Sequence, residues 1–186
     1  MTRQAISPDL SGGPGPDPIC TDYGTITSIA PAGDGRTVCA GTDDGRVRVT
    51  RNLGATWTKP AEGLPWVTRV VVDPADPDRV CTTHSAYRAG AGLAHVHGST
   101  DGGRHGKDLS GTCRTHPSTI WSSGRGKVLY IGTDQGVLAS PSGGRQWVRL
   151  GRGMPAVPVD DIEYDAGLHR MVAATFGRGF YELTTG

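Results

Sequence analysis

Three carboxylates stand in two copies of one short pattern. Val38–Gly45 and Leu129–Gly136 both run from an apolar stretch into Thr-Asp-x-Gly, which puts Asp43 and Asp134 at matching points of the chain and Asp44 directly after Asp43. Hydrolysis of a glycosidic bond uses two carboxyl groups, about 5 Å apart in retaining enzymes and about 6.5–9.5 Å apart in inverting ones. Asp43 or Asp44 paired with Asp134 would supply them, although the sequence leaves their separation open. Thr-Asp-x-Gly is also a hairpin turn, and for each aspartate alone the turn is the favoured interpretation.

A second group of side chains suits ligands rich in hydroxyl groups. Arg and amide groups form paired hydrogen bonds, and aromatic rings stack on the faces of sugars. Residues 82–94 form the one long insertion between otherwise regular segments, and long loops on a rigid scaffold often carry function. We therefore expect ligand binding by Trp66, His84, Tyr87, Arg88, His116, Gln135 and Arg178.

Histidines gather in the same part of the chain. His95 and His97 have the period-two spacing that puts both rings on one face of a strand, as a pair of metal ligands requires. No third ligand can be assigned from the sequence, so we predict neither a metal nor a cofactor. The chain also lacks the G-x-S-x-G, H-E-x-x-H, P-loop and dinucleotide-binding signatures.

Repeated short strands must position these residues. Three segments, beginning at Thr50, Ser99 and Ser140, share a hydroxyl residue, a small polar residue two places later and a Gly two places after that. Short β-branched and aromatic runs alternate with Gly-rich turns, which predicts strands joined by tight hairpins. A four-stranded antiparallel unit repeated in this way is a β-propeller blade. The sequence predicts an all-β protein of about four such blades, at about residues 26–65, 66–114, 115–155 and 156–184.

Over about residues 26–184 the repeats resemble the Asp-box (bacterial neuraminidase) repeat of sialidases, sortilin-like receptors, xyloglucan-cleaving glucanases and many uncharacterised bacterial propellers. In that family the box is a structural turn, whose polar side chains bond the turn's own backbone and whose Trp packs between strands. The resemblance implies this role for Thr50, Asn52, Gly54, Trp57, Ser99, Asp101, Gly103, Ser140, Ser142, Gly144 and Trp147. It also implies that the candidate ligand-binding residues gather at one mouth of the central channel.

Two departures from the family pattern matter. Gly106 stands where Trp57 and Trp147 stand in the other boxes, so we expect the second blade to be the least stable. Family rings usually have six or more blades, and this chain supplies about four. We therefore expect either a small closed ring or a partial ring closed by oligomerisation, for example by a homodimer. The Gly/Pro-rich residues 1–25 could instead donate a closing strand through residues 19–23.

Composition limits the class of partner. The chain has 29 Gly and 13 Pro among 186 residues, which excludes helix bundles, and its net charge of +1 does not suggest nucleic-acid binding. No apolar run is long enough to span a membrane. The resemblance to the Asp-box family suggests a secreted or periplasmic protein, but no signal peptide is visible in the sequence. The sequence does not determine whether the four cysteines form disulfides. They are Cys20, Cys39, Cys81 and Cys113.

These observations favour a binding or interaction module whose ligand is a glycan or a protein partner. The first alternative is a glycoside hydrolase, sialidase-like or glucanase-like, that uses the carboxylates of the channel mouth. The second alternative is a propeller fragment without activity of its own.

Overall fold

A computed structural model of the protein describes residues 4–12, 24–61, 63–85, 95–122, 128–165 and 167–184. Every regular element in these ranges is a strand, so none of them includes a helix able to cross a membrane. The strands of the first two blades are β1 (Ile26–Pro31), β2 (Val38–Thr42), β3 (Val47–Thr50), β4 (Thr58–Ala61), β5 (Trp66–Asp73), β6 (Asp76–Ser85), β7 (Val96–Ser99) and β8 (Lys107–Asp108). Those of the last two are β9 (Pro117–Ser122), β10 (Leu129–Thr133), β11 (Gly136–Ser140), β12 (Val148–Arg149), β13 (Val159–Asp165), β14 (Arg170–Thr175) and β15 (Gly179–Thr184).

The strands form four antiparallel sheets in chain order. The first three sheets have four strands each, β1–β4, β5–β8 and β9–β12, and the last has the three strands β13–β15. The all-β prediction of about four antiparallel blades is confirmed. Among the described residues, β15 is the outermost strand of the last blade.

Successive blades pack face to face, and an apolar core fills each seam between them. Val47 and Cys39 of the first blade meet Val67 and Val70 of the second. The other two seams are built in the same way. The second seam contains Val71, Cys81, Val96, Leu109, Cys113, Ile120, Leu129, Ile131, Leu138 and Trp147, and the third contains Tyr130, Val137, Ala139, Met154, Val159, Ile162, Met171, Ala173 and Leu183.

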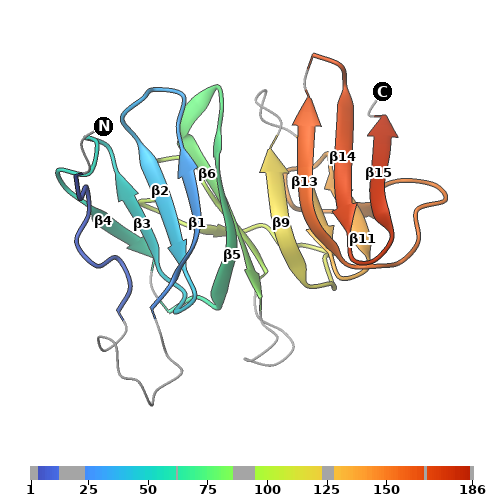
Figure 1. Ribbon diagram of the computed structural model, residues 1–186, viewed down its shortest axis with the longest axis horizontal. Coiled ribbons are helices and arrows are strands. Elements are labelled where there is room, and N and C mark those ends of the chain that lie inside the picture. Colours follow the sequence, from blue (N-terminus) through green and yellow to red (C-terminus); the bar gives the residue numbers. More distant parts are fainter. Residues whose placement is uncertain are drawn as a thin grey trace.

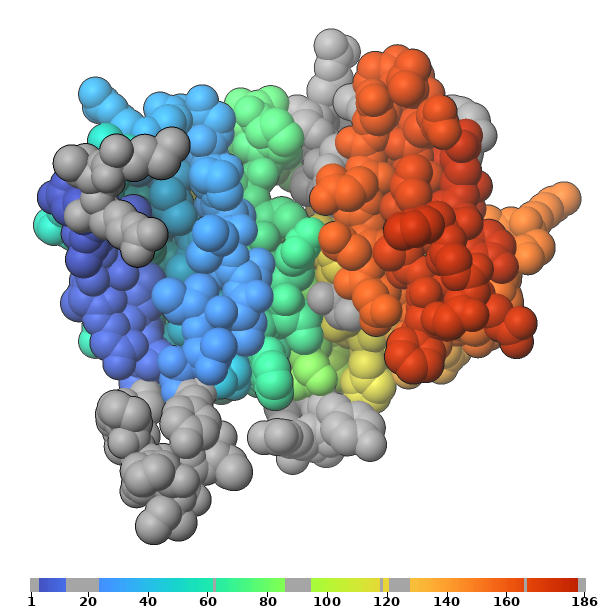
Figure 2. Space-filling model, viewed as in Figure 1, coloured from blue at the N-terminus to red at the C-terminus, as the bar shows by residue number. Residues whose placement is uncertain are grey.

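The four blades form a partial ring. In Figure 1 the inner strands β1, β5, β9 and β13 stand in that order from left to right. The first and last blades lie at opposite ends of the row, as the space-filling view of Figure 2 also shows. No apolar core of the described residues joins the last blade to the first. Across the inner side, Arg69 on β5 forms an ion pair with Asp161 on β13 (2.8 Å), and Thr119 on β9 donates its hydroxyl to the same carboxylate (3.2 Å).

The predicted closing strand at residues 19–23 lies outside the described residues. Residues 4–12 run along the first blade, where Leu10 is buried and its carbonyl accepts a hydrogen bond from Arg48 Nε (3.1 Å). Figure 1 shows this segment beside β3 and β4. The described part of the N-terminal segment is therefore a cover on the first blade.

Candidate functional site

The turns that follow β2, β10 and β14, and the described residues that lead into each inner strand, lie together at one end of the blades. We call this end the mouth, and it is the lower end in Figure 1. Asp43 and Asp134 make the same pair of hydrogen bonds there. The N–H of Thr25 donates to Asp43 Oδ1 (2.8 Å) and the N–H of Asp43 donates to the Thr25 carbonyl (3.0 Å). The N–H of His116 donates to Asp134 Oδ1 and that of Asp134 to the His116 carbonyl, both at 3.1 Å.

The other two blades make a related link without an aspartate. In the fourth blade the N–H of Phe176 donates to the Pro158 carbonyl (2.9 Å). In the second blade the donor is the His84 ring, whose Nδ1 lies 3.0 Å from the Pro65 carbonyl oxygen. In all four blades the end of the second strand, or the turn after it, is thus bonded to the chain that leads into the inner strand, and in two of them one aspartate oxygen accepts such a bond.

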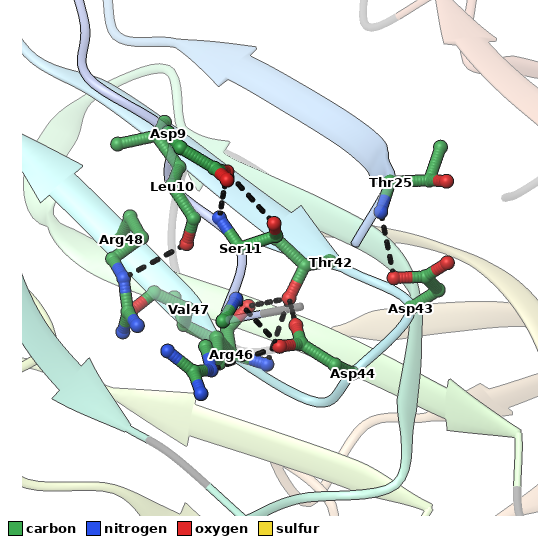
Figure 3. A network of polar contacts seen from close by, with 11 residues as sticks. Asp9, Leu10, Ser11, Thr25, Thr42, Asp43, Asp44, Arg46, Val47 and Arg48 are labelled. Carbon is green, nitrogen blue, oxygen red and sulfur yellow. Dashed lines mark hydrogen bonds and ion pairs between the residues drawn. The ribbon is translucent and has the colours of Figure 1, made fainter. Parts of the chain in front are cut away.

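Asp44 points to the other side of its turn and holds residues 4–12. Its carboxylate forms an ion pair with Arg46 Nε (2.9 Å), accepts the N–H of Gly12 (2.8 Å) and accepts the hydroxyl of Thr42. Figure 3 shows this network, with Asp43 directed toward Thr25 and Asp44 toward Arg46 and Thr42. The two neighbouring carboxylates therefore serve different contacts.

The remaining predicted ligand-binding residues differ in exposure. Trp66 begins β5 at the mouth and is 42% exposed, and Gln135 and Arg178 are exposed in mouth turns. His84 is fully buried and His116 is half-buried. Tyr87 and Arg88 lie outside the described residues. Among the described residues of this set, the exposed side chains at the mouth are therefore the Trp66 indole, the Gln135 amide and the Arg178 guanidinium.

The histidines form two ring pairs. His84 meets His97 edge to face with ring centroids 4.8 Å apart, and His95 meets His116 at 5.2 Å. Burial lowers the pKa of His84 to about 4 and also lowers the pKa of His95 and His97, because a charged imidazole loses its hydration there. No group of three or more potential metal ligands occurs in the part of the chain that the structure describes.

At the opposite end of the blades, the three box turns join third to fourth strands and repeat one hydrogen-bond pattern. In the first, the Gly54 N–H donates to Thr50 Oγ1 (2.9 Å) and the Thr56 N–H donates to Asn52 Oδ1 (2.8 Å). The same two bonds recur in the other turns, Gly103 to Ser99 and His105 to Asp101, then Gly144 to Ser140 and Gln146 to Ser142. The bonds from His105 also hold the pKa of Asp101 well below its usual range.

The box glycines also touch the segment in front of them. A Cβ atom at Gly54, where φ is +90°, would lie 2.0 Å from the Ile6 carbonyl oxygen, and one at Gly144 would lie 2.5 Å from Leu109 Cβ. The indole of Trp57 donates Nε1–H to the Ile6 carbonyl and that of Trp147 to the Leu109 carbonyl, both at 3.0 Å. Residues 4–12 therefore pack on the box turn of the first blade in the same way as the end of the second blade, at Leu109, packs on the box turn of the third.

No family model matches the chain, and no curated protein matches its sequence. Solved structures do match. A GH74 xyloglucanase from Xanthomonas campestris aligns at TM-score 0.64 and 16% identity over 86% of this chain, which spans 29% of that enzyme. The computationally designed Ika4 protein aligns over 100% of both chains at TM-score 0.70 and 14% identity. YCF48 bound to a D1 peptide aligns at 0.61 and 15% over 86% of this chain and 55% of that one.

The chain has a β-propeller fold. The similar structures support this fold and nothing finer, because their identities are low. Sequence reasoning missed the partners of the two mouth aspartates, Thr25 and His116. The signal that could have found them is a constant separation, since each aspartate follows its partner by 18 residues.

Proposed function

We propose that the chain is a binding module on an Asp-box propeller scaffold, with the ligand at the mouth and no hydrolysis. The observation that carries the proposal is the use of the carboxylates. Asp43 and Asp134 each commit one oxygen to a neighbouring backbone N–H, whereas a general acid or nucleophile needs its carboxyl group directed at substrate. The Trp66 side chain is 42% exposed at the mouth, and we assign contact with the ligand to this exposed surface.

The ligand we propose is a glycan or an extended protein segment. Both present alternating apolar and hydrogen-bonding groups, which a ring with nearby Arg and amide side chains can contact. Both classes occur in the names of the similar structures, as a xyloglucanase and as a protein bound to a peptide. Trp66, Gln135 and Arg178 are the side chains that we assign to this contact.

A glycan array, a random peptide library and a glycosidase panel test the proposal on the full chain. We expect saturable binding to one glycan or peptide class, weakened at least tenfold by Trp66→Ala, and no turnover. Leu168→Ala is the matched control, because Leu168 is exposed on the turn between β13 and β14, at the far end of the blades. Turnover abolished by Asp134→Asn would overturn the proposal in favour of the hydrolase. Unchanged binding in Trp66→Ala would refute the assignment of the mouth.

We also propose that a second copy completes the ring. The faces at the two ends of the row carry the residues that the inner seams bury. Ile29 pairs with Ala40, the position at which Val70, Ile120 and Ile162 stand in the other blades. Those three are buried against the preceding blade, whereas Ile29 is 66% exposed.

The other end of the row has the complementary feature. Phe180 pairs with Ala174, the position at which Val47 and Val137 stand in the first and third blades. Both valines are buried against the following blade, whereas Phe180 is 79% exposed. In the proposed dimer, the last blade of each copy packs on the first blade of the other. Phe180 of one copy then meets Ile29 of the other, as the residues of successive blades meet in the three seams within the chain.

Sedimentation of the full chain tests this arrangement. We expect a dimer, with Phe180→Asp and Ile29→Asp each shifting it toward monomer, and Val148→Asp, on the exposed outer strand β12, leaving it unchanged. An equimolar mixture of the two variants should form more dimer than either alone, because one of its two seams carries no substitution. A wild-type chain that stays monomeric at high concentration would refute the closure by a second copy.

A further inference from the structure

One of the three box turns lacks the aromatic residue of the other two. Trp57 stands directly before β4 and Trp147 directly before β12, and the residue directly before β8 is Gly106. The polar part of this turn is complete, since Ser99 and Asp101 accept the same N–H groups as in the other turns. The difference is therefore confined to one side chain.

The tryptophans show what that side chain would do. Trp147 is buried in the seam between the second and third blades, beside Ile120 and Leu129, and its Nε1–H reaches the Leu109 carbonyl of the preceding blade. Trp57 makes the corresponding bond to Ile6. Each indole thus lies against the segment in front of its blade, which is residues 4–12 for Trp57 and the second blade for Trp147, and donates one hydrogen bond to it.

The seam between the first and second blades contains a cavity of about 320 Å³ where this ring would lie. Gly103 and Gly106 of the box turn line it on one side, and Pro60 of β4 lines it on the other. A Cβ atom at Gly103 would lie 3.1 Å from Pro60 Cβ, just as one at Gly144 would meet Leu109. Pro60 therefore stands at this seam where Leu109 stands at the next seam. Between the box turn and Leu109 lies the Trp147 indole, whereas between the box turn and Pro60 lies the cavity.

The walls of the cavity suit a flat apolar ring. Val47, Leu64 and Val80 supply apolar surface, and His97 and Asp108 supply polar groups. An apolar cavity of roughly 150 Å³ is large enough to bind benzene, so this one has room for two fused rings. The Nδ1 atom of His97 is buried and has no hydrogen-bond partner among the described residues.

We propose that this cavity binds a small bicyclic heteroaromatic molecule with a ring N–H, of which indole is the simplest example. The ring lies between Gly106 and Pro60, in the way that the Trp147 indole lies against Leu109 in the next seam. The N–H donates to His97 Nδ1 in the tautomer that carries the imidazole proton on Nε2. The lining of the cavity includes none of Trp66, Gln135 and Arg178, so the proposal is independent of the ligand proposed at the mouth.

Titration of the full chain with indole and with benzothiophene, which has the same shape but no N–H, tests the proposal. Calorimetry should show one saturable indole site and about tenfold weaker binding of benzothiophene, the effect of one hydrogen bond. His97→Leu should remove that preference. Equal affinity for the two molecules in the wild-type chain would refute the assignment of His97.

Gly106→Trp is the decisive variant, because it places a covalent indole in the cavity. Nothing lies within 4 Å of a Cβ atom at Gly106, so a side chain can begin there without a clash. We expect Gly106→Trp to abolish indole binding and to raise the melting temperature, which also shows that the variant folds. Val148→Trp, on the exposed strand β12, should leave both properties unchanged. Undiminished indole binding in Gly106→Trp, or no saturable binding in the wild-type chain, would overturn the proposal.

Discussion

His84 should make the fold sensitive to mild acid. Its ring is fully buried, its Nδ1–H donates to the Pro65 carbonyl and its Nε2 accepts the hydroxyl of Thr82 (2.8 Å). Burial lowers its pKa from 6.5 to about 4, so below pH 6.5 the unfolded chain binds the proton more readily than the folded chain does. The stability that His84 contributes is therefore complete above pH 6.5 and is lost as the pH falls toward 4.

The size of the effect follows from the two pKa values. One unit corresponds to about 1.4 kcal/mol, so the loss attributable to His84 is about 2 kcal/mol at pH 5 and approaches about 3 kcal/mol at pH 4. His95 and His97 are shifted in the same direction and add to the loss. A change of 2 kcal/mol is a large part of the 5–15 kcal/mol that typically stabilises a domain.

Urea unfolding followed by tryptophan fluorescence at pH 7.5 and pH 5 measures this loss. His84→Thr is the informative variant, because Thr42, Thr133 and Thr175 hold the equivalent position in the other blades. Whatever its stability at pH 7.5, this variant should lose about 2 kcal/mol less than the wild-type chain on going to pH 5.

The control is His169→Asn, which removes an exposed histidine whose φ of +51° asparagine tolerates. It should show the wild-type loss. An equal loss in His84→Thr and in the wild-type chain would refute the reasoning, because burial of this one ring would then have no part in the acid sensitivity.

Three further outcomes are expected. Asp134→Ala should destabilise the chain by about 0.5–1.5 kcal/mol in urea unfolding, because the His116 N–H loses an exposed hydrogen bond, while the fold persists by circular dichroism. Trp147→Phe should cost about 1–3 kcal/mol, since it removes the bond to the Leu109 carbonyl and leaves that seam less well filled. Cys39 should resist iodoacetamide at pH 8 until the chain is unfolded, because burial raises its pKa to about 12; rapid native labelling measured by mass spectrometry would contradict this.

The sequence carried the fold because its repeats are local. The box residues from Thr50 to Trp57 lie within one turn, so their pattern is visible without knowledge of distant contacts. The same is true of the alternation of short strands and glycine turns, which predicted the four sheets. What could not be predicted was contact between segments far apart in the chain. The bond from Trp57 to Ile6 crosses 51 residues, and the ion pair from Arg69 to Asp161 crosses 92.

The mouth illustrates the same limit on a smaller scale. Thr-Asp-x-Gly predicts a turn at Asp43 and Asp134, but not that the side chain reaches the residue in front of the inner strand. The cavity beside Gly106 was visible in the sequence only as a missing aromatic residue. Its volume and its lining depend on Pro60 and His97, which come from two different blades.

The meeting of three inner strands at Asp161 has a mechanical consequence. Arg69 and Thr119 hold the second, third and fourth blades to one carboxylate, whereas the first blade is bonded only to the second there, by Thr27 and Ser28 of β1 to the backbone of β5, among the bonds found for the described residues. We expect the three blades held at Asp161 to keep their relative positions when the row flexes. A ring bound in the cavity would then bear on the seam that lies outside this group.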